Sequence, residues 1–254
     1  MKSKNFLIPD GIEYFIGDDA IKFDKLKASI LKIYNKYNYT YISPPIFDSI
    51  DNLLNLNSSD LDNKTAHILD RATGSNIGVR AAITPQISKV DYQISKGVGN
   101  SKYSYMGDIL RLSPGPFDRI NPYQTGVEYF GSINKKTDIE VIKLMIDLIS
   151  LSKQQKIIIE LGDLSFIHNL LSGLNLSQEY RLRLIDLINL KSKSEIQEFF
   201  KNNKLSNKKL LLLLELINIS GDISVLIELK KLSNSFKLNL SLEINELLSI
   251  AKSI

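Results

Sequence analysis

The chain has 254 residues, with 32 Lys and Arg against 28 Asp and Glu, a formal net charge of +4 at pH 7. Hydrophobic residues make up 43% of it, which is enough for a buried core and excludes disorder throughout. It has no cysteine, so disulfides, thiolate metal sites and a cysteine nucleophile are excluded. The two histidines, His67 and His168, are too few for a histidine-rich metal site. We therefore expect no metal and no cofactor.

Neither a leader nor a membrane span is predicted. The apolar run Phe6-Leu7-Ile8 stops at Pro9, well short of the signal-peptide core of about 7–15 residues. The most apolar segment, Leu210–Leu214, lies between Lys209 and Glu215, whereas a membrane span needs about 20 apolar residues. We therefore expect no membrane association and a cytoplasmic location.

The composition changes along the chain. All seven prolines lie between Pro9 and Pro122, and ten of the thirteen glycines precede residue 132. The rest of the chain is rich in Leu, Ile, Lys and Ser. Such a change indicates that a turn-rich mixed region gives way to a helical one. We predict an α+β domain over residues 1–160 and a helical region over residues 161–254, with the boundary near Gln154 to Gly162.

The first predicted elements are a helix over Asp18–Tyr37 and a strand over Tyr39–Ser43. Apolar residues recur through the helix at helical spacing, with lysines between them. The strand is aromatic and β-branched and ends at Pro44. Its position directly after the helix predicts a helix that packs on a sheet.

Two strand pairs follow. Thr65–Asp70 and Asn76–Ile83 are predicted to form a hairpin around Thr73-Gly74-Ser75. Tyr103–Arg111 and Thr125–Ser132 are predicted to form a second, longer pair. The loop between those two strands contains three prolines.

The remaining predicted elements are mainly helices. Asp138–Ser152 has helical periodicity, and Lys156–Leu161 is predicted to be a short apolar strand. From Leu164 onward we expect a small bundle of four or five short helices packed on the sheet. The individual helices are predicted over Ser177–Leu190, Lys193–Asn202, Asn207–Ile219, Asp222–Leu232 and Leu240–Lys252.

Four segments carry a resemblance to a known family, and they are Leu7–Phe15, Tyr37–Pro45, Asp70–Gln86 and Tyr105–Gly131. In this order they resemble the catalytic core of class II aminoacyl-tRNA synthetases of the histidyl branch. They are similar to the opening Pro-x-Gly segment, motif 1, the arginine-proline-acidic-x-threonine hairpin and motif 2. The resemblance implies an antiparallel sheet flanked by helices, and self-association through the motif 1 segment.

Within that branch, Thr84-Pro85-Gln86 resembles a relative that is not a synthetase. That relative is the regulatory subunit of ATP phosphoribosyltransferase, the first enzyme of histidine biosynthesis. The resemblance implies a protein without catalytic activity of its own, which activates a short-form catalytic subunit and takes part in feedback by L-histidine. In the family this complex is a hetero-octamer.

Synthetase chemistry needs groups that the sequence does not present. The family clamps the ATP phosphates with one arginine from motif 2 and another from motif 3, because charge develops on the phosphoryl group. Arg111 matches the first of these. The acidic residue expected two positions later is Ser113, and neither a motif 3 segment nor an anticodon-binding domain is found before Ile254. We therefore expect no aminoacylation and no tRNA binding.

The resemblance also implies a set of histidine-binding residues. These are Thr84 from the hairpin, Arg111 from motif 2, and Gln124 and Glu128 from the second motif 2 strand. The acidic hairpin residue that would hold the ligand's ammonium group falls on Ala82. Burying an ammonium without a partner costs on the order of several kcal/mol. Retained and lost histidine binding therefore both stay open from the sequence.

The same residues also have a structural interpretation. Glu128 could form a salt bridge with Arg111 or Arg80 across the sheet. Gln124 and Thr84 could satisfy backbone groups at strand ends. For Arg80, which lies between Val79 and Ala81, the structural interpretation is favoured.

Two functions from other classes are kept beside the regulatory one. One is a synthetase-like adenylating enzyme that charges another acceptor, for which amino-acid-dependent pyrophosphate exchange is expected. The other is a truncated, non-functional copy that folds but engages no partner. Co-purification with a short-form transferase subunit separates the regulatory interpretation from both.

Overall fold

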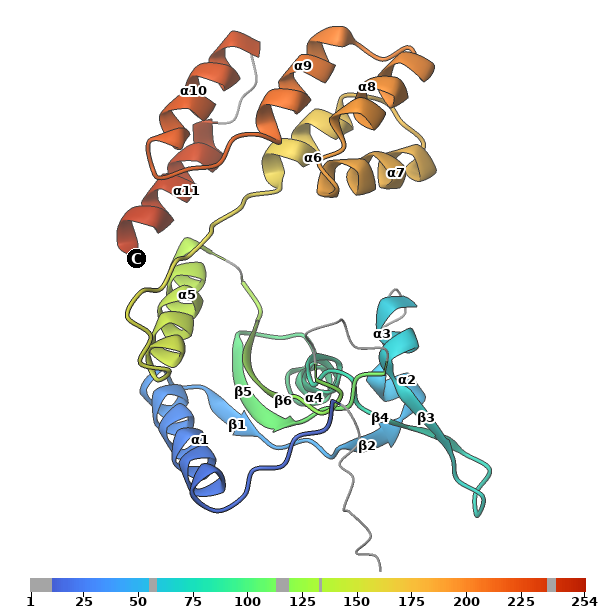
Figure 1. The fold of residues 1–254 in the computed structure, drawn as a ribbon, viewed down its shortest axis with the longest axis vertical. Coiled ribbons are helices and arrows are strands. Elements are labelled where there is room, and N and C mark those ends of the chain that lie inside the picture. The colour runs from blue at the N-terminus through green and yellow to red at the C-terminus, as the bar shows by residue number, and fades with distance from the viewer. Residues whose placement is uncertain (1–10, 55–58, 113–118, 133, 237–240) are drawn as a thin grey trace, which may run out of the picture. The chain divides into compact units, whose positions relative to one another are not determined.

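The structure is a computed structural model that describes residues 11–54, 59–112, 119–132, 134–236 and 241–254. The chain divides into two compact units between Lys156 and Ile157. The first unit contains sheets and helices, and the second is helical (Figure 1). The α+β class expected from the sequence is therefore confirmed.

The described residues of the first unit form two three-stranded sheets. The main sheet has the strand order β1-β5-β6, and the second sheet has the order β2-β4-β3. Its elements are, in chain order, α1 (Asp18–Lys36), β1 (Thr40–Ile42), β2 (Phe47–Ser49), α2 (Ile50–Leu53), α3 (Ser59–Lys64), β3 (Ala66–Leu69), β4 (Asn76–Val79), α4 (Thr84–Ser95), β5 (Ser101–Asp108), β6 (Tyr123–Phe130) and α5 (Lys135–Ser150).

The main sheet combines two kinds of strand pairing. β5 and β6 are antiparallel, with Tyr105 opposite Gly126 and Tyr103 opposite Glu128. β1 runs parallel to β5, with Thr40 opposite Tyr103. Parallel neighbours need a long crossover, and here the connection includes the whole second sheet and α4. The expected antiparallel sheet thus carries one parallel edge strand.

Helices cover both faces of the main sheet, as Figure 1 shows. On one face, Ile30 and Tyr34 of α1 and Leu144 of α5 pack against Met106. On the other face, α4 packs against the aromatic residues of β5, as described below. Because successive strand residues point to opposite faces, the odd-numbered residues of β5 face α4 and Met106 faces α1.

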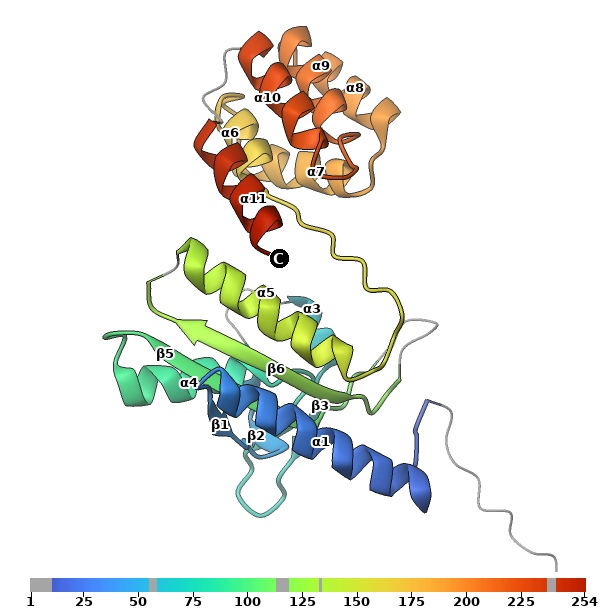
Figure 2. The ribbon, with the colours of Figure 1, turned by 90° about the vertical axis from the view of Figure 1, so that its left-hand side faces the viewer.

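The helices α1 and α5 lie along the same face of the sheet (Figure 2). Asp147 of α5 accepts hydrogen bonds from Lys36 Nζ at 2.9 Å and from the Tyr37 hydroxyl at 3.1 Å. Tyr34 is completely buried, and its hydroxyl lies 2.5 Å from Thr125 Oγ1 on β6. Burial raises the pKa of Tyr34 to about 12. These contacts fix α1 to both α5 and the sheet.

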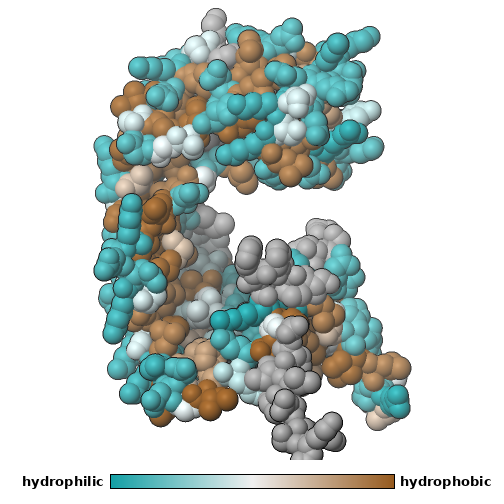
Figure 3. All heavy atoms as spheres, in the orientation of Figure 1, coloured by the Kyte–Doolittle hydropathy of each residue, from teal (hydrophilic) through white to brown (hydrophobic). Residues whose placement is uncertain are grey.

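The second sheet is built on the predicted hairpin of β3 and β4. Its turn forms as expected, with Gly74 at a φ of 71° and its N–H bonded to the Asp70 carbonyl at 2.7 Å. A Cβ at Gly78 would lie 2.7 Å from Ile50 and 2.9 Å from Leu53, so glycine allows α2 to cover this face. Figure 3 shows apolar side chains gathered on the side of the unit where the hairpin lies. The exposed apolar residues of the second sheet include Phe47, Ile68 and Leu69.

Two predictions of secondary structure were wrong. The strand predicted over Asn76–Ile83 ends at Val79, and Thr84 begins helix α4. Pro85 explains the change, because the fixed φ of proline suits the first turn of a helix. Residues 156–161 form no strand, since none of the described strands lies beside them to pair with. The short elements β2, α2 and α3 were not predicted.

The second unit contains helices α6 to α11. Their bounds are α6 (Ser165–Ser172), α7 (Gln178–Asn189), α8 (Lys193–Asn202), α9 (Asn207–Leu216), α10 (Val225–Phe236) and α11 (Ser241–Ser253). Five of them match predicted helices, and α6 is the additional one. The main core of the second unit includes Leu184, Ile196, Phe200 and Leu213, each at most 1% exposed. Within the described residues, no helix is both long and apolar enough to cross a membrane.

Candidate functional site

The structure brings the four residues implied by the resemblance to the α4 side of the main sheet. Thr84 is the first residue of α4, and Arg111 follows β5. Gln124 and Glu128 lie four residues apart on β6, so both side chains project from the same face. All four side chains are half-buried.

These four residues converge on one short backbone segment, Ala81–Thr84. Thr84 Oγ1 donates to Glu128 Oε1 at 2.7 Å. Gln124 Oε1 accepts the N–H of Ile83 at 3.0 Å, and Arg111 Nε donates to the carbonyl of Ala81 at 3.3 Å. We call Thr84, Arg111, Gln124 and Glu128, together with Tyr105, the β6 cluster.

The structural interpretations of these residues have different outcomes. Glu128 forms no ion pair with Arg111 or Arg80, although the structure describes all three side chains, so the salt bridge considered from the sequence was wrong. Gln124 does satisfy a backbone N–H, that of Ile83. Thr84 does not end a strand; it starts a helix and bonds a carboxylate. The cluster is therefore held by hydrogen bonds.

Tyr105 belongs to the cluster although sequence reasoning did not select it. Its hydroxyl lies 3.2 Å from Thr84 Oγ1 and 3.3 Å from Glu128 Oε1. Burial raises the pKa of Tyr105, the hydrogen bond to Thr84 lowers it, and the negative charge of Glu128 raises it further. The available signal was Gly126, since a glycine inside a strand often marks a close approach by another group.

Arg80 has the structural role that the sequence favoured. Its side chain is buried, and the guanidinium donates to the carbonyls of Asp108 at 2.8 Å, Pro44 at 2.7 Å and Pro45 at 3.2 Å. A Cβ at Gly107 would overlap this guanidinium, so glycine is needed there. Arg80 therefore joins β4 to β5 and to the segment after β1.

Gln86, the residue that pointed to the regulatory relative, is also structural here. It is 3% exposed, and its Nε2 donates to the carbonyl of Pro45 at 3.0 Å and to Asp48 Oδ2 at 3.1 Å. Because both hydrogens of the amide nitrogen have acceptors, the orientation of the amide is fixed. Gln86 thereby ties the first turn of α4 to the second sheet.

Asp48 provides a test of this connection by pH. Burial acts to raise the pKa of Asp48, but hydrogen bonds from Asn52 and Gln86 hold it below the ordinary value of 3.8. The stabilisation is therefore complete above the unfolded pKa and is lost as the pH falls through the lower folded pKa. We expect the stability difference between the native chain and Asp48→Asn to shrink below about pH 4. Urea denaturation between pH 6 and pH 3 checks this, with exposed Asp51→Asn as control; a difference independent of pH would contradict it.

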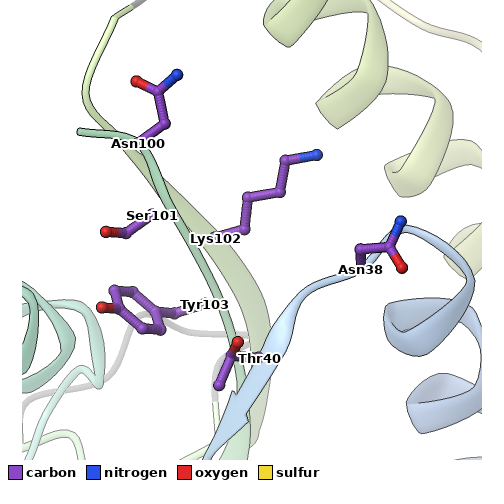
Figure 4. Close-up of a pocket in the computed structure, with 6 residues that line it drawn as sticks. All are labelled: Asn38, Thr40, Asn100, Ser101, Lys102 and Tyr103. Carbon is purple, nitrogen blue, oxygen red and sulfur yellow. The ribbon is translucent and has the colours of Figure 1, made fainter.

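A separate hollow of about 420 Å³ lies at the start of β5 and is lined by six residues, all labelled in Figure 4. There, Lys102 and Tyr103 leave the strand on opposite sides. Lys102 Nζ is bonded to both carboxylate oxygens of Glu140, at 2.6 and 2.8 Å. Its charge is therefore already paired, and the hollow is not the candidate site. Among the described residues, no cluster of three or more His, Asp or Glu could hold a metal ion.

Two expected features cannot be placed. Ser113, at the position of the motif 2 acidic residue, lies outside the described residues, as does Pro9 of the opening segment. Ala82, at the position of the hairpin acidic residue, is described and is half-buried. A methyl group therefore occupies the position where the resemblance implies a carboxylate.

A sheet covered by helices on both faces agrees with the class II aminoacyl-tRNA synthetase-like fold that the resemblance implies. The sequence matches the family described as histidyl-tRNA synthetase over residues 11–254. The chain belongs to the histidyl-tRNA synthetase family.

Among curated proteins, the chain is similar to an ATP phosphoribosyltransferase regulatory subunit from Saccharophagus degradans. The two are 30% identical over 247 residues, which is 97% of this chain and 63% of that protein. Further relatives with the same description are covered over 50% and 64% of their length. The chain thus spans about half to just under two thirds of the length of these relatives.

Solved structures agree on the fold. A protein from Bacillus halodurans, described as an ATP phosphoribosyltransferase regulatory subunit/histidyl-tRNA synthetase, matches all of this chain and 68% of its own, with a TM-score of 0.78 and 19% identity. A chain from an ATP phosphoribosyl transferase complex of Thermotoga maritima matches 90% of this chain and 74% of its own, with a TM-score of 0.66 and 18% identity. At these identities the matches establish the shared fold.

Proposed function

We propose that this chain acts as a regulatory subunit of ATP phosphoribosyltransferase, in the first step of L-histidine biosynthesis. The observation that carries the proposal is the 30% identity, over 97% of the chain, to a protein described as that subunit. The fold shared with a chain from a transferase complex supports it. In this role the chain has no catalytic activity of its own and works in the cytoplasm by binding a short-form catalytic subunit.

The β6 cluster favours a binding role over synthetase chemistry. Adenylation needs cationic groups on the ATP phosphates. In the cluster, Arg111 is the cationic member, and its Nε is already bonded to the Ala81 carbonyl. The surrounding groups are a threonine, a tyrosine, an amide and a carboxylate, which suit recognition of a small polar ligand. We therefore infer neither ATP chemistry nor tRNA binding for this chain.

L-Histidine is the proposed ligand of the cluster. The Glu128 carboxylate can accept from an imidazole N–H, Gln124 can bond the ring through its amide, and Arg111 can pair with the ligand carboxylate. At Ala82 the ammonium group finds no carboxylate, so binding is weaker than in a pocket that has one. Weak binding suits feedback, because the subunit then responds only when histidine accumulates.

The direct test mixes the chain with a purified short-form transferase subunit. We expect the two proteins to co-elute as one hetero-oligomer. We propose that this assembly is a hetero-octamer in which the chain self-associates through α1 and β1. We also expect transferase turnover to rise on mixing. Separate elution together with unchanged turnover would refute the proposal, while amino-acid-dependent pyrophosphate exchange by the chain alone would favour the adenylating alternative.

A second prediction concerns the ligand. Glu128→Ala is expected to weaken histidine binding by at least about tenfold, because a hydrogen bond to a charged group contributes roughly 1.5–3 kcal/mol. Isothermal calorimetry measures the affinity, and Asp138→Ala, an exposed carboxylate in the same unit, serves as control. Equal affinities of the native chain and Glu128→Ala would show that histidine binds elsewhere, and no heat with the native chain would end the feedback role.

A further inference from the structure

Three oxygen atoms meet at the centre of the β6 cluster. Glu128 Oε1 lies 2.7 Å from Thr84 Oγ1 and 3.3 Å from the Tyr105 hydroxyl, and the two hydroxyls are 3.2 Å apart. A carboxylate only accepts, so the two hydroxyl hydrogens must supply all three contacts. Thr84 gives its hydrogen to Glu128 at the shortest distance. The Tyr105 hydrogen is therefore shared between Thr84 Oγ1 and Glu128 Oε1.

Gly126 leaves the space that the Tyr105 hydroxyl occupies. Tyr105 and Gly126 are opposite each other on β5 and β6. A Cβ at Gly126 would lie 2.5 Å from the Tyr105 hydroxyl oxygen and 2.7 Å from the ring carbon that bears it. Any other residue would push the ring away, so the glycine admits the phenol to the space beside Glu128.

The backbone of Tyr105 is held from the opposite face of the sheet. Thr125 Oγ1 donates to the carbonyl of Tyr105 at 3.2 Å, and the same Oγ1 lies 2.5 Å from the hydroxyl of Tyr34 on α1. Tyr105 is 4% exposed, and it packs with Ile83, the residue before α4, and with Ile87 of α4. With backbone and ring both fixed, the hydroxyl has a defined position.

We propose that Tyr105 is a positioning residue for Glu128, holding its carboxylate, through Oε1 and together with Thr84, in the orientation in which it meets a ligand. Thr84 alone fixes one contact of a carboxylate that can still rotate. The second hydroxyl, built into the core, limits that rotation. The inference deepens the proposed histidine site, and the ligand measurement below rests on it.

The first experiment needs no ligand. With 13Cζ-labelled tyrosine, NMR titration follows the pKa of Tyr105, whose resonance is assigned by Tyr105→Phe. The negative charge of Glu128 raises this pKa, so Glu128→Gln is expected to lower it, whereas Glu140→Gln on α5 is expected to leave it unchanged. An unchanged pKa of Tyr105 in Glu128→Gln would overturn the inference, because the hydroxyl would then not meet the carboxylate.

The second experiment uses L-histidine and isothermal calorimetry. Tyr105→Phe removes the hydroxyl and is expected to weaken histidine binding about fivefold. Tyr103→Phe, on the same face two residues earlier, is the matched control and is expected to bind as the native chain does. Circular dichroism checks that both variants are folded, and a merely structural Tyr105 would lower the melting temperature without changing the affinity.

The outcomes separate the inference from the proposed function. Equal histidine affinity in folded Tyr105→Phe and in the native chain would overturn the positioning role. If the native chain binds no histidine, the feedback proposal fails, and the tyrosine titration alone decides whether Tyr105 holds Glu128. If Tyr105→Phe does not fold, Gly126→Ala, which displaces the hydroxyl but keeps it, takes its place and is expected to weaken binding similarly.

Discussion

Replacing Arg80 by alanine is expected to lower the free energy of unfolding of the first unit by about 3–5 kcal/mol. The guanidinium is buried and donates to three backbone carbonyls, those of Pro44, Pro45 and Asp108. Burial lowers the pKa of Arg80, yet the group stays charged at neutral pH because arginine titrates far above it. Its removal leaves buried carbonyls without donors and a cavity in place of the side chain.

Urea denaturation followed by tyrosine fluorescence measures this effect, because ten of the eleven tyrosines precede Lys156. Arg71→Ala, on the exposed hairpin turn, is the matched control and is expected to change stability by less than about 0.5 kcal/mol. The stability of Arg80→Lys is expected to lie between those of Arg80→Ala and the native chain. A lysine ammonium group keeps the charge but cannot reproduce the planar set of N–H donors of a guanidinium. If Arg80→Ala unfolded at the same urea concentration as the native chain, the structural role assigned to Arg80 would be contradicted.

Phe200→Ala is expected to destabilise the second unit by about 3–5 kcal/mol, the usual cost of deleting a buried phenylalanine side chain. Phe200 on α8 is 1% exposed and packs in the main core of that unit. Replacing it leaves a cavity among short helices that are held together mainly by this core. We therefore expect α6 to α9 to unfold early.

Far-UV circular dichroism follows the helices of both units, while tyrosine fluorescence follows mainly the first unit. In Phe200→Ala, part of the dichroism signal is expected to be lost at lower urea concentration, while the fluorescence midpoint stays near the native value. Leu190→Ala, at a residue 75% exposed in the same unit, is the control and is expected to be nearly neutral. A parallel shift of both signals would show that the two units unfold together.

Periodic elements of this fold could be predicted from the sequence, and elements set by distant contacts could not. The helical spacing of apolar residues predicts helix α1, and the glycine-containing turn predicts the hairpin of β3 and β4. Helix α4 was missed because Thr84-Pro85 reads equally well as the end of a strand. Residues 156–161 are apolar like a strand but lack a neighbouring strand, and periodicity alone cannot supply one.

The candidate site shows the same division. The resemblance selected Thr84 and Glu128, and in the structure Thr84 Oγ1 lies 2.7 Å from Glu128 Oε1. It did not select Tyr105, because the role of that residue depends on the register that sets it opposite Gly126. Hydrogen-bond partners across a strand pair follow from register, and one residue of slip would turn Tyr105 toward α1.

The first turn of α4 has a mechanical consequence for the whole first unit. Thr84 bonds Glu128 of the main sheet, and two residues later Gln86 bonds Asp48 of the second sheet. One helical turn is thus anchored to both sheets, and Arg80 adds a third attachment nearby. A relative rotation of the sheets must break at least one of these bonds. The two sheets of the first unit are therefore expected to move together and not to rotate against each other.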